Sequence, residues 1–175
     1  MGKVVFIETE ESEKVKKLSL REKAYLAGFL DGDGSIMAQI ISRPENVLKF
    51  GLRVSLSLTQ LTIRKSRLDD IKNEIGAGNV RDRNDKVSVY ELQDMQAVRV
   101  LLTQLLPYLK IKKNQALLAI QIAVIFPSVS NDQPSKFLEL CKKADKVASF
   151  NDSKKRTNTA ETVRKKFIEQ NWLKE

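Results

Sequence analysis

Residues 25–36 of the chain read YLAGFLDGDGSI and hold three of its seven glycines. Just before them, Ser19 and Glu22 have the spacing of a capping box, in which each side chain accepts a hydrogen bond from the other residue's backbone N–H. We therefore expect a helix that begins at Leu20. It should end near Gly32, because the Gly-Asp-Gly sequence that begins there does not sustain a helix.

Small residues recur every four positions in this helix, at Ala24, Gly28 and Gly32. Such a stripe lets another element approach the helix backbone closely, and the spacing alone fits the chain's own sheet as well as a second helix. Asp31 and Asp33 favour the second helix, because carboxylates at the negative end of a helix dipole are repelled unless a cation offsets them. Two helices crossing at the stripe would gather oxygen ligands suited to Mg²⁺. The sequence holds one copy of the motif, so the second helix would come from another chain.

The rest of the chain predicts an α+β domain with one four-stranded antiparallel sheet and helices on one face. Residues 1–17 read as a loose charged extension, and residues 18–175 as a single domain. Strands are expected over 35–41, 50–59, 79–83 and 87–92. Helices are expected over 63–75, 95–106, 112–125, 134–150 and 159–171. The phase of the fourth strand stays open, because Val87, Val89 and Glu91 compete with Ser88, Tyr90 and Leu92 for the outer face.

The composition narrows the possible chemistry. A net charge of +9 and a pI near 9.6 predict a polyanionic partner. The absence of histidine excludes Ser-His-Asp triads, His-ligated metals and nucleases with a histidine base. The single cysteine, Cys141, excludes disulfide frameworks. No apolar run approaches the roughly 18 residues of a membrane helix, so no membrane partner is expected, and the N-terminus lacks the pattern of a targeting segment.

Residues 25–36 closely resemble the LAGLIDADG motif of homing endonucleases, in particular the subgroup with a single motif per chain. The resemblance extends over about residues 20–165, with further matching blocks at 58–60, 80–83, 107–116, 134–138 and 151–154. It implies the αββαββα fold of that family with additional C-terminal helices. It also implies a homodimer whose motif helices pack at the two-fold axis, with two sheets forming a saddle over double-stranded DNA. The residues matched to the dimer interface are Ala24, Gly28, Phe29, Asp31 and Gly32, of which Asp31 is read as structural.

The resemblance also implies the catalytic machinery. Asp33 matches the metal-binding acid, together with the backbone carbonyl of Gly32, and two or three Mg²⁺ ions are expected at the dimer axis, with Mn²⁺ as a substitute. Gln60, Arg64 and Lys112 match polar and basic residues around the scissile phosphates. Taken alone, Gln60 also fits a solvated strand end, and the two cations fit ordinary surface charges. Without histidine, a metal is the expected means of lowering the pKa of the attacking water.

The outer face of the sheet is the expected DNA-contacting surface. An antiparallel ribbon fits the major groove, where Arg reads guanine and Gln reads adenine. A solvated sheet face is the alternative for such residues. The predicted contacts are Met37, Gln39, Ile41, Arg43, Gly51, Arg53, Ser55, Ser57, Arg81 and Arg83, with Ser153, Lys154, Lys155 and Arg156 on the backbone beyond the sheet.

The function implied by the resemblance is site-specific cleavage of DNA. The enzyme would make a staggered double-strand break in a long pseudo-palindromic site, with no small-molecule substrate, and would be encoded in a mobile intron of an organelle. The alternative is a nucleic-acid-binding protein that does not cleave, such as an intron RNA maturase or a DNA-binding regulator. Retention of Asp33, Gln60, Arg64 and Lys112 favours the enzyme.

Overall fold

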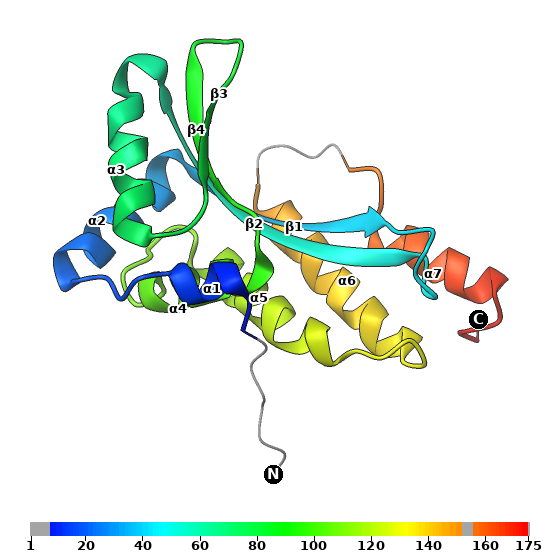
Figure 1. Ribbon diagram of the computed structural model, residues 1–175. Helices are drawn as coiled ribbons and strands as arrows, with labels where there is room; N and C mark the ends of the chain where they lie inside the picture. The colour runs from blue at the N-terminus through cyan, green and yellow to red at the C-terminus, as the bar shows by residue number, and fades with distance from the viewer. Residues whose placement is uncertain (1–7, 152–155, 175) are drawn as a thin grey trace.

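The fold is built on one four-stranded antiparallel sheet. The computed structural model describes residues 8–151 and 156–174. The strands are β1 (Gly34–Ser42), β2 (Phe50–Leu61), β3 (Asn79–Asp82) and β4 (Val87–Leu92), in the order β1-β2-β4-β3. Figure 1 shows α2, α4, α5 and α6 gathered on one side of β1 and β2, and α3 alongside the β3–β4 hairpin. The predicted α+β class is confirmed.

The helices begin and end close to the predicted positions. They are α2 (Leu20–Asp33), α3 (Lys65–Ile75), α4 (Met95–Leu105), α5 (Lys113–Ile125), α6 (Pro134–Ser149) and α7 (Ala160–Glu169), with short 3₁₀ turns η1 (Thr62–Arg64) and η2 (Phe126–Ser128). The capping box of α2 is formed, because Ser19 and Glu22 each accept the other's backbone N–H. None of the helices described in 8–151 and 156–174 is long and apolar enough to cross a membrane.

The hydrophobic core fills the space between the sheet and the helices. Alternate residues of β2, including Leu52, Val54, Leu56 and Leu58, are buried against it, as the alternation predicts. The register pairs Glu91 with Ser57 and Tyr90 with Leu58. Val87, Val89 and Glu91 therefore lie on the outer face, and Ser88, Tyr90 and Leu92 face the core.

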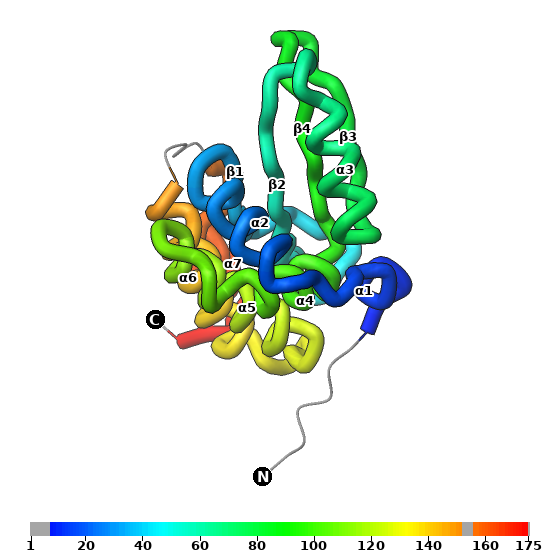
Figure 2. The backbone as a smooth tube through the Cα atoms, turned by 90° about the vertical axis from the view of Figure 1, so that its left-hand side faces the viewer, coloured from blue at the N-terminus to red at the C-terminus, as the bar shows by residue number. Residues whose placement is uncertain are grey.

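The β3–β4 hairpin rises above the layer of helices, with α3 beside it (Figure 2). Arg67 ties α3 to α2, because its guanidinium lies 4.5 Å from the centre of the Tyr25 ring and donates to the Tyr25 hydroxyl at 3.2 Å. The same guanidinium forms two hydrogen bonds with Glu74, at 2.8 and 3.2 Å. These contacts hold α2 against α3, which lies beside the hairpin.

The segment before α2 corrects the expectation of a loose extension over residues 1–17. It contains a short helix, α1 (Glu10–Lys14), whose N-cap hydroxyl, on Thr9, donates to Asp94 at 2.7 Å. The Glu11 carboxylate accepts the backbone N–H of Gly78 at 2.8 Å, and Lys16 N–H donates to the last carbonyl of α3 at 2.8 Å. Residues 9–16 are therefore part of the folded domain. Residues 1–7 lie outside the described part of the chain.

Candidate active site and nucleic-acid interface

Three of the four predicted catalytic side chains form one hydrogen-bonded series at the C-terminal end of α2. The Gln60 Nε2 donates to Asp33 Oδ2 at 2.9 Å, and Arg64 Nη1 donates to Gln60 Oε1 at 3.2 Å. β2 supplies Gln60 and the following turn η1 supplies Arg64, so one strand end brings both side chains to the end of α2. The amide of Gln60 thus bridges a carboxylate and a guanidinium.

Asp31 holds Lys112 beside this series. Its Oδ2 accepts the backbone N–H groups of Lys110 and Ile111, at 2.7 and 3.2 Å, and its Oδ1 accepts that of Lys112 at 2.8 Å. The Lys112 ammonium donates to the backbone carbonyl of Asp31 at 2.6 Å. The Asp31 carboxylate therefore has a structural role in its own chain. This agrees with reading Asp31 as structural, and its place at a dimer interface stays a prediction.

The ionised form of Asp31 is favoured in the folded state. Burial raises the pKa of this carboxyl, but the three backbone N–H groups and the charge of Lys112 outweigh burial, so the pKa lies below its ordinary value. A group whose folded pKa is depressed stabilises the fold above its unfolded pKa. That stabilisation is lost as the pH falls through the folded pKa, so Asp31 contributes to stability at neutral pH and not in strong acid.

We expect Asp31→Asn to lower the free energy of unfolding by about 2 kcal/mol at pH 7, because an amide NH₂ would face backbone N–H donors. Urea denaturation at pH 7 and again near pH 2.5 measures the effect. The difference between the variant and the natural chain should shrink at the lower pH, because the Asp31 carboxyl of the unfolded chain is protonated there and keeping it ionised in the folded chain then contributes less to stability. A difference that is the same at both pH values would contradict the account.

The donors at the end of α2 suit a hard divalent cation, although one chain supplies few of them. Asp33 is exposed, and Gln60 contacts one of its two oxygens. The last carbonyls of a helix lack intrahelical partners, which leaves the Gly32 carbonyl available, and the last turn of α2 holds no basic residue. In the described residues no group of three or more Asp, Glu, Cys or His side chains could hold a metal. The donor set thus fits one part of a shared Mg²⁺ site.

The stripe of small residues on α2 does not pack on its own sheet. Ala24, Gly28 and Gly32 are exposed, and a Cβ atom built on either glycine would meet no atom within 4 Å. Phe29 is half-buried on the neighbouring face of the helix. The alternative of intramolecular packing is therefore wrong for this stripe. The exposed face of α2 that carries the stripe ends at Gly32, next to Asp33.

The face of the sheet opposite the helices carries the predicted residues of β1 and β2. The register places them across from one another: Met37 with Ser55, Gln39 with Arg53, and Ile41 with Gly51. Gln39 and Arg53 are exposed, and Ser57 is half-buried. Ser55 is only 6% exposed, and Gly51 is buried beneath Ile41 and the Arg43 side chain, which follows the end of β1. The prediction of a solvent-facing position is wrong for these two, and for Gly51 the reason is that the longer side chains of Ile41 and Arg43 cover it.

The predicted arginines of the hairpin are exposed and paired with acids. Arg81 forms two hydrogen bonds with Glu91, and Arg83 Nη2 lies 2.8 Å from Asp85 Oδ2 in the turn. Sequence reasoning did not identify Glu91, because the phase of β4 was unresolved and no other signal pointed to it. Arg156 donates to Asp145 at 2.7 Å. Ser153, Lys154 and Lys155 lie outside the described residues.

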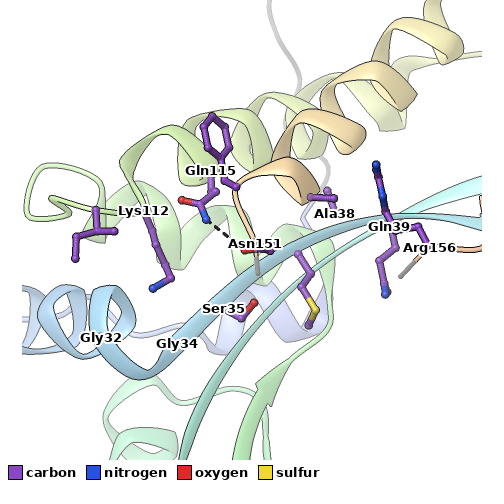
Figure 3. Close-up of a pocket in the computed structure, with 13 residues that line it drawn as sticks. Gly32, Gly34, Ser35, Ala38, Gln39, Lys112, Gln115, Asn151 and Arg156 are labelled. Atoms are coloured by element: carbon purple, nitrogen blue, oxygen red, sulfur yellow. Dashed lines mark hydrogen bonds between the residues drawn. The ribbon is translucent and has the colours of Figure 1, made fainter. Parts of the chain in front are cut away.

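A cavity of about 620 Å³ connects the end of α2 to this face of the sheet. It lies between the first half of β1 and the facing ends of α5 and α6, and Lys112 and Arg156 line it (Figure 3). Figure 3 shows Lys112 directed towards the Gly32–Gly34 segment, and Gln115 donating to Asn151 at 3.3 Å. The cavity thus has two cations in its wall, between β1 and the C-terminal end of α2.

Comparison with known proteins identifies one group of relatives. The family described as LAGLIDADG endonuclease matches residues 26–124. The chain is 47% identical to DNA endonuclease I-CreI of Chlamydomonas reinhardtii over 140 residues, which are 80% of this chain and 85% of the relative. It is 45% identical to DNA endonuclease I-CvuI of Chlorella vulgaris over 141 residues, or 81% and 86% of the two chains.

Solved structures show the same fold. The crystal structure of I-CvuI with its DNA target and Ca²⁺ superposes with a TM-score of 0.81 and 39% identity, covering 89% of this chain and all of that one. A second I-CvuI structure, with the I-CreI target and Mg²⁺, gives a TM-score of 0.80 and 42% identity over 86% of this chain and 95% of that one. In that second crystal the DNA is not cleaved.

Proposed function

Because the chain belongs to the LAGLIDADG endonuclease family, we propose that it is a site-specific homing endonuclease whose active site is completed by two copies of the chain. The observation that best supports this proposal is the hydrogen-bonded series Asp33–Gln60–Arg64, with Lys112 beside it. The series lies at the end of an exposed stripe of small residues. The reaction is hydrolysis of one phosphodiester bond in each DNA strand, which leaves a staggered break. This arrangement also favours cleavage over the role of a binding protein that does not cleave.

Two α2 helices would cross at Gly28 and Gly32, where nothing in the chain itself occupies the space. The crossing brings the Asp33 carboxylate and the Gly32 carbonyl of both chains to one place. These oxygens would hold Mg²⁺, as two or three shared ions with Mn²⁺ as a substitute, and the metal supplies a water of lowered pKa and neutralises phosphate charge. The Ca²⁺ and Mg²⁺ present in the I-CvuI crystals support the use of a divalent cation.

The protein side chains have separate tasks in this reaction. Gln60 orients the Asp33 carboxylate through its amide and can hydrogen-bond a water molecule near the phosphorus. Arg64 and Lys112 donate to the phosphate oxygens as negative charge grows there, and a fixed cation lowers the energy of that state without rearranging. Asp31 keeps Lys112 in position through the loop before α5.

The sheet supplies the target preference. Two copies of a +9 chain carry +18, so DNA affinity should depend strongly on salt. The exposed Gln39 and Arg53 are suited to reading bases in the major groove, and a dimer would read a long pseudo-palindromic site. The curated relatives come from Chlamydomonas reinhardtii and Chlorella vulgaris. We extend the proposal to a gene carried by a mobile intron in an organelle.

Incubation with a library of randomised DNA duplexes tests this function. In Mg²⁺ we expect one family of pseudo-palindromic sequences to be cut in both strands, and sequencing of the ends gives the stagger. In Ca²⁺ we expect the same sequences to be bound and left intact. Sequence-specific binding with no cleavage in Mg²⁺ or Mn²⁺ would contradict the endonuclease and favour a regulator. A preference for structured RNA over every duplex would favour the maturase.

A further inference from the structure

One acid stands on the face of the sheet that would meet DNA. Among the residues of the four strands, all of which the structure describes, Glu91 is the only Asp or Glu on the face that carries Gln39 and Arg53. A carboxylate in that place repels the phosphates of an approaching duplex unless a cation offsets its charge. Its presence on an otherwise neutral or basic face calls for a physical reason.

Glu91 is held in a side-on pair with Arg81. Arg81 Nε donates to Glu91 Oε2 at 3.0 Å, and Arg81 Nη2 donates to Glu91 Oε1 at 2.8 Å. Gln93 also donates to Glu91 Oε2, at 3.2 Å. The hydrogen bonds from Arg81 lower the pKa of Glu91 although burial raises it, so the carboxylate stays ionised. The Glu91 side chain is 22% exposed and that of Arg81 is 58% exposed, so the arginine is the outer member of the pair.

The pair leaves the outer end of the guanidinium free for a ligand. An arginine carries five N–H donors, and Glu91 takes the one on Nε and one of the two on Nη2. The three remaining donors lie on Nη1 and Nη2, which form the end-on fork that binds the O6 and N7 acceptors of guanine. Arg81 is also paired in register with Val89, which is only 4% exposed. The backbone end of the arginine therefore lies next to a buried residue.

We propose that Glu91 is a positioning residue that holds Arg81 in the orientation required to read a guanine, at one pair of symmetry-related positions in the target. The carboxylate acts through Arg81 and makes no base contact of its own. Because the guanidinium is held before DNA arrives, less of its side-chain freedom is lost on binding. The inference rests on the proposed function, since it requires this face of the sheet to lie in the major groove.

The test is a binding profile of Glu91→Gln on the randomised duplex library in Ca²⁺, beside the natural chain. Glutamine keeps the shape of glutamate but offers an NH₂ group to one of the two Arg81 donors. We expect the guanine preference at one symmetric pair of positions to fall about fivefold, within the range that one bidentate contact supplies. Total DNA affinity should not fall, because each dimer loses two negative charges from the face that meets phosphates.

Three further variants separate positioning from other roles. Arg81→Ala should abolish the preference at the same positions, and adding Glu91→Gln to Arg81→Ala should leave the profile unchanged. Glu139→Gln in α6 makes the same chemical change in another ion pair, in which Lys142 Nζ lies 2.6 Å from the carboxylate, and should leave the profile as it is. Thermal unfolding of all variants shows whether the sheet stays folded.

The outcomes distinguish this inference from the proposed function. If the natural chain selects no sequence at all, the proposed function fails. If the natural chain selects a site and Glu91→Gln gives the same profile, the inference about Glu91 is overturned while the function stands. A change of equal size in the Arg81→Ala background would also overturn it, because the carboxylate would then act on a base directly.

Discussion

Asp33→Asn should abolish DNA cleavage while leaving dimerisation and sequence-specific binding intact. Asn keeps one oxygen that can accept from Gln60, so the local fold has no reason to change. It removes one negative charge per chain, and two at the shared centre, from the groups that would hold Mg²⁺. We expect the single-turnover cleavage rate to fall by at least about 10³-fold, as is typical when a group central to the transition state is lost.

Single-turnover cleavage of the selected duplex and its binding in Ca²⁺ measure the two properties separately. Asp70→Asn in α3 is the matched control, because its exposed carboxylate lies 3.8 Å from Arg67 and away from the Asp33–Gln60–Arg64 series. This control should cleave at the natural rate. Nicking by Asp33→Asn at an unaltered rate would refute the assignment of Asp33.

Gly28→Leu should convert the dimer to monomers and remove cleavage with it. A Cβ atom at Gly28 meets no atom of the rest of the chain within 4 Å and the position is exposed, so the monomer should fold normally. Leucine also has a higher helix propensity than glycine, by about 0.5–1 kcal/mol, which works against any loss of α2 itself. The four-carbon side chain would instead occupy the space that the second α2 helix requires for close approach.

Sedimentation velocity at micromolar concentration gives the oligomeric state, and circular dichroism shows whether the monomer is folded. Arg21→Leu adds the same side chain to an exposed position of α2 outside the stripe, and it should remain a dimer. Gly28→Ala, which adds one carbon atom, should weaken the dimer less than leucine does. An intact, active Gly28→Leu dimer would show that the helices meet elsewhere.

The elements that could be predicted are those with a local signal. The Ser19–Glu22 capping box fixes the start of α2, and Gly76 ends α3 with a positive φ of 86°. The alternation in β2 identifies which of its faces is buried. The phase of β2 alone leaves Gln60 open between a solvated strand end and a site residue, and its place near Asp33 is implied by the family resemblance.

The features that sequence reasoning missed depend on contacts between distant residues. α1 has only five residues, too few for a stable helix in isolation, and its hydrogen bonds to Asp94 and Gly78 hold it in place. In β4 the buried face carries polar groups: Tyr90 donates to the Ala77 carbonyl at 3.0 Å, and Ser88 donates to Asp82 at 2.7 Å. Hydrophobicity alone therefore could not assign the faces of β4.

We propose that two identical chains share one divalent-cation site through their Asp33 side chains. Crystals of the protein with its selected duplex and Mn²⁺, measured at a wavelength where manganese scatters anomalously, locate the metal directly. We predict anomalous peaks between the two Asp33 carboxylates, where the α2 helices of the two chains cross. Peaks remote from both Asp33 residues, or α2 helices that do not meet, would contradict the account.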